Sequence, residues 1–153
     1  MIATPVAIVQ AAPVVRPATG AALGRLVIPR LGVNVVFRQG TSAPVVDRGP
    51  GHYPSTSLPG HGGTVGIAGH RVTHTHPFLR INLLRRNDQI VLVMKHRRYV
   101  YRVFRMRILP QRQVWPLRPV HGEQLVLTAC HPPRTDLRRL VVFARLASVR
   151  PGL

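Results

Sequence analysis

The hydrophobic residues of this chain gather in short runs that are separated by turns rich in proline and glycine. Valine, isoleucine and leucine dominate these runs, and residues 99–105 alternate between apolar and polar positions, as a strand with one buried face does. We expect strands at 24–30, 34–40, 64–68, 89–95, 97–109, 125–129 and 139–146. Seven or eight short strands predict a closed or nearly closed β-barrel, because closure removes exposed sheet edges.

Helical signals are few. A short helix is expected near residues 43–47, and a second where residues 78–84 carry apolar side chains at helical spacing. Residues 41–63 are rich in proline, glycine and serine, and a loop of this length within a compact domain usually has a function. A second proline-rich connection, 111–123, carries Trp115. The prediction is an all-β fold with one or two short helices.

The chain has 153 residues, which suits a single domain with a real core. Residues 1–22 are apolar but interrupted by three prolines, so we expect a flexible lead segment. Its apolar stretches are too short to span a bilayer, and it lacks the basic start of a signal peptide. A spacer and the remnant of a membrane anchor region both stay open. The folded domain is assigned to 23–149 and a short tail to 150–153.

Charge sets this sequence apart. It has 22 lysines and arginines against four acids, for a formal charge of +18, and nearly all the cations are arginine. Nucleic acid, anionic lipid and a polyanionic wall polymer would each be attracted, although a general excess of arginine explains the composition equally well. No long basic run marks a nucleic-acid arm, so no specific nucleic-acid partner is expected. A basic β-barrel module that binds nucleic acid or an anionic polymer remains an alternative.

The chain has one cysteine, Cys130, at the end of the apolar run 125–129 and before a Pro-Pro pair. A single cysteine excludes an intramolecular disulfide. His74 and His76 have no acid or second cysteine near them in the sequence, so neither a metal site nor a cofactor is expected. On its own, a cysteine in this position is most often a small buried side chain.

Two further residues give Cys130 a chemical context. His70 follows the apolar run 64–68, and Arg139 begins the strand predicted for 139–146. A thiolate is a strong nucleophile, an imidazole exchanges protons with it, and a guanidinium stabilises an oxyanion. Cys130, His70 and Arg139 therefore supply one residue for each task of thiol-based acyl transfer. Each of them alone is more often structural or solvated.

Three blocks of the sequence resemble the sortases, cysteine transpeptidases of Gram-positive cell surfaces. The first resembles the histidine segment of the family, the second its T-L-x-T-C strand and the third its R-L-I/V-V strand. The first block comprises residues 51–54, 58–60, 67–71 and 77–78. The second comprises residues 125–132, and the third comprises residues 139–144. The separation of His70 and Cys130 is also near what the family uses. The G-H-Y-P start and the C-H-P after the cysteine most resemble the class E sortases of actinobacteria.

This resemblance implies a closed eight-stranded sortase-type barrel, with 23–149 as the catalytic domain. It implies that Cys130 attacks the Thr–Gly bond of an LPxTG- or LAxTG-like sorting signal and forms a thioacyl intermediate. An amine of lipid II or of a pilin lysine would then resolve it. His70 carries over as general acid/base, and Arg139 as the residue that steadies the oxyanion or positions the substrate. Tyr53 is a tentative substrate-binding residue whose alternative role is core packing.

Two positions depart from the family pattern. Ala129 stands where the family has threonine before the cysteine, and Val126 stands for its leading threonine. The missing hydroxyl at 129, a tentative substrate-binding position, keeps open a catalytically impaired sortase relative. The resemblance further implies a place on the outer face of the cell membrane, with attachment through a segment that is not visible in this sequence.

Overall fold

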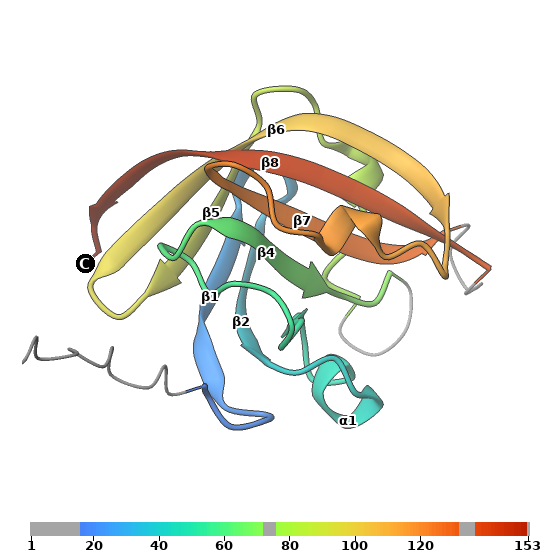
Figure 1. Cartoon of the computed structure of the whole chain (residues 1–153), viewed down its shortest axis with the longest axis horizontal. Coiled ribbons are helices and arrows are strands. Elements are labelled where there is room, and N and C mark those ends of the chain that lie inside the picture. Colours follow the sequence, from blue (N-terminus) through green and yellow to red (C-terminus); the bar gives the residue numbers. More distant parts are fainter. Residues whose placement is uncertain (1–15, 72–75, 132–136, 153) are drawn as a thin grey trace, which may run out of the picture.

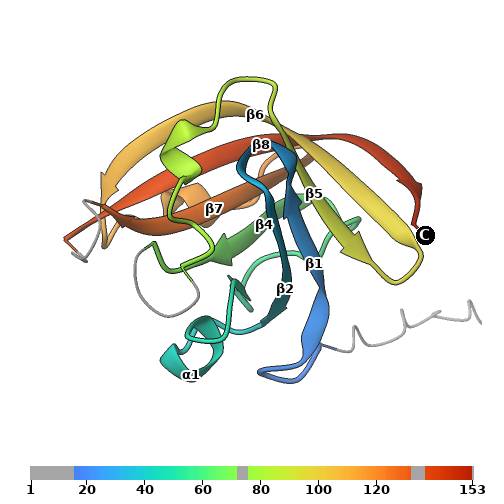
Figure 2. The same cartoon turned by 180° about the vertical axis from the view of Figure 1, so that it is seen from behind.

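The computed structural model describes residues 16–71, 76–131 and 137–152, without the side chains of Cys130 and His131. Eight strands form a closed barrel in the order β1-β2-β3-β4-β7-β8-β6-β5. Figures 1 and 2 show the barrel from opposite sides. The strands are β1 (Ala22–Ile28), β2 (Val33–Gln39), β3 (Gly51–His52), β4 (Gly63–Ala68), β5 (Gln89–Met94), β6 (Arg97–Pro110), β7 (Glu123–His131) and β8 (Arg138–Pro151). The prediction of an all-β, closed eight-stranded barrel is confirmed.

Most neighbouring strands are antiparallel, but β2–β3 and β4–β7 are parallel pairs. The β4–β7 pair joins segments far apart in sequence, since the β5–β6 hairpin lies between them in the chain. Each residue of β4 lies opposite the residue 60 positions later, from Gly63 opposite Glu123 to Ala68 opposite Thr128 (123 − 63 = 60 and 128 − 68 = 60). This constant register matters for the site because both strands run towards the same end of the barrel.

In the residues that the structure describes, helical structure is limited to single turns. The helix expected near 43–47 is α1 (Ala43–Val46), and the turns η1 (Pro29–Leu31), η2 (Ile81–Leu83) and η3 (Trp115–Leu117) are 3₁₀ helices. The helix predicted for 78–84 is wrong in type and length. Its buried residues Phe78, Ile81 and Leu84 recur every three positions, which is the period of a 3₁₀ helix and not of an α-helix.

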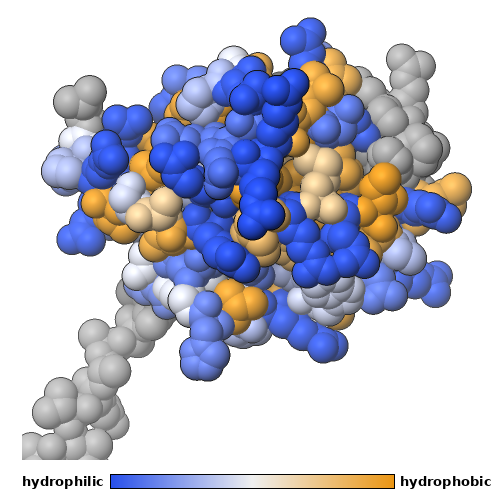
Figure 3. Space-filling model, turned by 90° about the horizontal axis from the view of Figure 1, so that it is seen from above, coloured by the Kyte–Doolittle hydropathy of each residue, from blue (hydrophilic) through white to orange (hydrophobic). Residues whose placement is uncertain are grey.

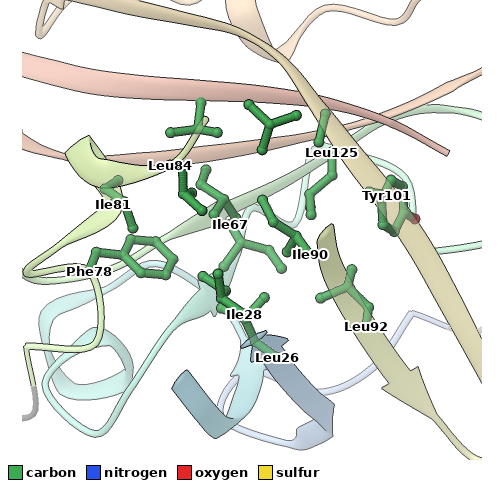
Figure 4. Packing of buried hydrophobic residues seen from close by; sticks show 14 of the residues in the cluster. Leu26, Ile28, Ile67, Phe78, Ile81, Leu84, Ile90, Leu92, Tyr101 and Leu125 are labelled. Atoms are coloured by element: carbon green, nitrogen blue, oxygen red, sulfur yellow. The ribbon is translucent and has the colours of Figure 1, made fainter. Parts of the chain in front are cut away.

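The interior of the barrel is filled by alternate residues of every long strand. Leu26 and Ile28 of β1 meet Ile67 of β4 and Ile90 of β5 in one cluster, which Phe78 closes at one end (Figure 4). All five side chains are fully buried. At about 25 cal/mol per Å² of apolar area removed from water, such side chains supply most of the stabilisation of a small domain.

A second, smaller apolar cluster lies on the outside of the barrel wall. Val126 of β7 packs with Val141 and Phe143 of β8, and the connection carrying Trp115 covers them. The Trp115 and Phe143 rings stack with centroids 5.7 Å apart. This cover makes β7 apolar on both faces, which explains its continuous hydrophobic run.

Described residues near both ends of the chain are held to the barrel. The Gly20 N–H donates to Gln39 O at 2.7 Å, and β8 pairs with β6 as far as Pro151 opposite Arg97. In the described part of the chain, no helix has the length and apolarity to cross a membrane.

Candidate active site

Two of the three residues singled out from the sequence lie on the adjacent strands β7 and β8, and His70 lies two residues beyond the end of β4. Cys130 lies directly opposite Arg139 in the antiparallel β7–β8 pair, so the two positions share one face of the sheet. Beyond the end of β4, the Gly69 N–H donates to Thr128 O at 3.0 Å and continues the β4–β7 pairing. The same register brings His70 level with Cys130 (130 − 70 = 60). The backbone positions 70, 130 and 139 thus form a row across the end of the barrel wall.

The position of the Cys130 sulfur lies outside the described part of the structure. The alternation of β7 nevertheless divides its described residues clearly. Leu125, Leu127 and Ala129 belong to the interior cluster, whereas Val126 belongs to the outer one. Position 130 therefore falls on the outer face of the wall, together with Thr128.

His70 has an acidic partner from a distant loop. Its Nε2 lies 2.9 Å from Asp47 Oδ1, and both side chains are partly exposed. Asp47 is the C-terminal cap of α1, and its backbone N–H donates to Ala43 O and Val45 O. The backbone around His70 is fixed from two sides. The N–H of Gly69, directly before it, donates to Thr128 O at 3.0 Å, and the N–H of Phe78 donates to His70 O at 3.0 Å. A carboxylate at this distance orients an imidazole ring.

Arg139 is held by a hydrogen-bond chain. Its NH1 donates to Tyr53 OH at 2.8 Å, and Tyr53 OH lies 2.7 Å from Thr128 Oγ1. The tyrosine oxygen accepts from the guanidinium, so its own hydrogen is available for Thr128. Tyr53 comes directly after β3, and its N–H donates to Gly66 O at 2.9 Å. The guanidinium is therefore positioned by two strands besides its own.

These side chains surround a groove of about 290 Å³ at the end of the barrel. Residues from α1, β4, β7 and β8 line it, including Val46, Ala68, His70, Thr128 and Arg139. Hollows of similar size lie elsewhere, such as one of about 350 Å³ beside Leu31 and Arg80. Size alone does not single out the groove, but its chemistry does, because it joins an imidazole–carboxylate pair to a positioned guanidinium. In Figure 1, α1 and the arrowhead of β4 lie at this same end.

The two tentative substrate-binding residues both reach the groove. Tyr53 and Ala129 are among its lining residues. Ala129 also packs in the interior cluster and is 4% exposed, so a larger side chain there would press on the core. Tyr53 is half-buried and bonded to Arg139 and Thr128, so its hydroxyl serves the site's polar network as well as packing.

The neighbouring loop is organised by a buried histidine. His52 is 1% exposed, its Nε2 lies 2.8 Å from Ser57 O, and its Nδ1 lies 2.7 Å from Gln39 Oε1. Burial lowers the pKa of His52, although the bond to Ser57 opposes this shift. A neutral His52 thus fixes the turn after β3, from which Tyr53 reaches towards the groove.

Sequence reasoning missed Asp47 and Thr128. Asp47 lies in a proline- and glycine-rich stretch with no spacing relation to His70, and the only available signal was that the chain has just four acids. Thr128 was passed over because the family pattern directs attention to positions 126 and 129. Among the described residues no cluster of three or more histidine, cysteine or acidic side chains comes together. His74, weighed for such a cluster, lies outside the described residues.

An open barrel end with a thiol-bearing strand between a histidine and an arginine defines a candidate thiol acyl-transfer site. A sortase domain family model matches residues 26–147. This chain therefore belongs to the sortase family. Among curated relatives, it is 37% identical to sortase SrtE1 of Streptomyces coelicolor over 88% of its length and 30% identical to sortase D of Bacillus subtilis over 76%. The chain spans only 42% and 58% of these two proteins, respectively.

Solved structures agree with this assignment. Sortase E1 of Streptomyces coelicolor, with a tripeptide in its active site, superposes with a TM-score of 0.83 at 32% identity and covers 86% of this chain and 91% of its own. Sortase E of Streptomyces avermitilis gives 0.81 at 32% identity, with 88% and 93% covered. The sortase SrtA of Actinomyces oris gives 0.84 at 29% identity, with 88% and 84% covered. The expected resemblance to class E sortases is confirmed.

Proposed function

We propose that this protein is a cysteine transpeptidase that cleaves a C-terminal sorting signal and transfers the upstream polypeptide to an amine. The observation that carries the proposal is the row of positions 70, 130 and 139 across β4, β7 and β8. A nucleophile between an imidazole and a guanidinium meets the geometric needs of acyl transfer. Family membership favours this function over a basic binding module.

Each residue has a role in the proposed reaction. The Cys130 thiolate attacks the scissile carbonyl carbon, and the peptide C–N bond breaks as His70 gives a proton to the leaving amine. The bond to Asp47 holds the imidazole in place through this exchange. Arg139 donates to the carbonyl oxygen as it becomes negative, and an incoming amine then displaces the thiol from the thioester.

The Tyr53–Arg139 bond supports an oxyanion role for the arginine. A guanidinium fixed by Tyr53 has lost its rotamer freedom before substrate arrives, and a preorganised donor stabilises the transition state at no reorganisation cost. Tyr53 and Ala129 line the floor on which the residues before the scissile bond would lie.

The substrates are proposed by chemical class. We expect an LAxTG- or LPxTG-like signal peptide as acyl donor and an amine of lipid II or a pilin lysine as acceptor. The solved sortase E1 with a tripeptide in its active site supports a peptide-binding groove here. The corresponding location is the outer face of the cell membrane of a Gram-positive actinobacterium.

Mass spectrometry of the intact protein tests the reaction. Incubation with a Leu-Ala-x-Thr-Gly peptide, and in parallel with its Leu-Pro-x-Thr-Gly counterpart, should add to the protein the mass of the peptide up to threonine. Hydroxylamine should release that mass, because it cleaves thioesters. A diglycine acceptor should instead give a ligated peptide.

The control variant is Cys130→Ala, which should form no adduct and lose at least about 10³-fold in rate, as loss of a nucleophile does. Turnover that survives this change would overturn the proposal. An adduct that maps to any other residue would overturn it as well.

A further inference from the structure

The outer face of β6 and β8 carries a row of arginines outside the groove, here called the arginine ladder. Its members are all exposed and comprise Arg98, Arg102, Arg105, Arg107, Arg145 and Arg150. Arg98 lies directly opposite Arg150, and Arg102 directly opposite Arg145. Like charges directly opposite each other destabilise a sheet. Two such pairs in one ladder indicate that these arginines have a function other than stabilising the fold.

The acids of the described part of the chain do not neutralise this ladder. The ion pairs among the described residues are Arg30 with Asp88 and His70 with Asp47, and neither involves the ladder. Glu123 accepts hydrogen bonds from Gly60 N–H at 3.0 Å and from the Tyr101 hydroxyl. Each carboxylate in the described part of the chain is thus engaged elsewhere, and none of them compensates the positive charge of the ladder.

Aromatic rings hold part of the ladder in place. The Arg145 guanidinium carbon lies 3.9 Å from the centroid of the Phe104 ring, and that of Arg105 lies 5.6 Å from both Trp115 and Phe143. A guanidinium stacked on a ring keeps its N–H groups at the edge, where they are free to contact an anion. The ladder is therefore partly preorganised for bidentate binding of phosphate.

The shape of the face decides between anionic ligands. In Figure 1, β6 and β8 arch over the barrel, so the ladder follows a convex line. Figure 3 looks down on this face and shows hydrophilic side chains over much of it. From position 98 to position 107 the ladder extends about 30 Å, at roughly 3.3 Å per residue. A planar bilayer would touch only the crest of such an arch, whereas a flexible linear chain follows it.

We infer that the arginine ladder binds an extended linear polyphosphate. Successive phosphates contact successive guanidinium groups along β6 and β8, and counterion release drives the association. The groove stays open, because the ladder runs along the wall and away from the groove. The inference does not rest on the proposed reaction, since it concerns binding alone.

Inorganic polyphosphate is the probe, and its affinity is measured by titration at several salt concentrations. The ladder variant replaces Arg98, Arg102, Arg145 and Arg150 by glutamine. The matched control replaces Arg16, Arg25, Arg48 and Arg80, which are also exposed but lie off the ladder. Both variants have the same formal charge, +14, because four charges are removed from +18 (18 − 4 = 14).

The ladder variant should bind polyphosphate at least about tenfold more weakly than the control variant. Its plot of log affinity against log salt should also be shallower, with a slope smaller in magnitude by about three to four. Its thermal unfolding should not move to lower temperature, because two repulsive pairs are relieved. If both variants lose the same amount of affinity for polyphosphate, the binding depends only on net charge, and the inference is overturned. Ladder-dependent binding to phosphatidylglycerol vesicles without binding to polyphosphate would also overturn it, in favour of a membrane surface. The Cys130→Ala variant should bind polyphosphate as the unchanged protein does, which separates this result from that of the transpeptidase test.

Discussion

The two ends of β7 use their polar residues in opposite ways. At its start, Glu123 is surrounded by fixed donors, with Gly60 N–H at 3.0 Å, Gly62 N–H at 2.9 Å and the Tyr101 hydroxyl. At its other end, the partly exposed Asp47–His70 pair and the Arg139–Tyr53 bond border an open groove. One strand thus joins an end that is closed by its hydrogen bonds to an end that is open to a ligand.

The two ends of β7 differ in the groups that supply their hydrogen-bond donors. Backbone N–H groups cannot leave Glu123, and Gly60 and Gly62 have positive φ values of 90° and 75°, which glycine adopts without strain. Burial, together with the bond to Glu123, raises the pKa of Tyr101, so this hydroxyl remains a donor. Side chains, in contrast, can release one partner for another during a reaction. The contacts at the Glu123 end are therefore fixed, whereas those at the groove end can be exchanged.

After loss of the nucleophile itself, the largest effect is expected at the open end, from Arg139→Lys. Lysine keeps the charge but cannot bind Tyr53 and an oxyanion through one planar fork, so the transpeptidation rate should fall by about 10²-fold, as for loss of one oxyanion donor. Steady-state kinetics on a sorting-signal peptide measure it. Arg138→Lys is the matched control because Arg138 lies opposite His131, one position along β8, and is exposed. A loss in the control instead would move the role to Arg138.

At the closed end, Glu123→Gln should lower stability and leave chemistry alone. The charge-assisted bonds from Gly60, Gly62 and Tyr101 weaken to neutral ones, so the free energy of unfolding should drop by about 2 kcal/mol. Denaturant titration gives this value, and the rate per folded molecule should remain that of the unchanged protein. A lower rate at unchanged stability would mean that the two ends are not separate.

A smaller effect is expected from Asp47→Asn, which keeps the shape of the His70 partner but removes its charge. We expect kcat to fall by about tenfold, within the range over which positioned proton transfer contributes. KM and the melting temperature should not change. Asp88→Asn is the control, because Asp88 pairs with Arg30 away from the groove and should leave kcat unaltered. Equal losses in both variants would speak against an orienting role.

The smallest effect concerns pH and the buried His52. Because burial lowers its pKa below the ordinary value of 6.5, the unfolded chain binds more protons than the folded one in mildly acid solution. This contribution to stability is complete above that value and is lost as the pH falls below it, at no more than about 1.4 kcal/mol per pH unit. Melting temperatures between neutral and mildly acid pH should show the decline. A His52→Gln variant should show a flatter profile, and an identical slope would exclude His52 as the cause.

Much of this barrel could be predicted from its sequence because the long strands carry their own signal. The hydrophobic run of β7 and the alternation in β6 both depend on burial against neighbours, and burial leaves a pattern in the residues. The prediction failed where structure is too short for a period. The two-residue strand β3 lies between Pro50 and Pro54, and it is defined only by its pairing with β2 and β4.

The candidate site divides in the same way. Cys130, His70 and Arg139 stand at strand ends, so chemistry and position together made them visible. Asp47 was invisible because its pairing with His70 depends on how the loop 41–50 folds back, and no local rule specifies that path. Thr128 resembles any polar residue in a strand until Tyr53, 75 positions away, is placed beside it.

The parallel pairing of β4 with β7 also means that the candidate site is assembled from segments made at different times during synthesis. Residue 70 leaves the ribosome long before its neighbours, since 60 more residues must follow before position 130 exists, and Arg139 comes later still. A nascent chain that ends before β8 would contain position 130 without position 139, which lies opposite it in the folded sheet. The three candidate positions can therefore come together only once β8 has been made.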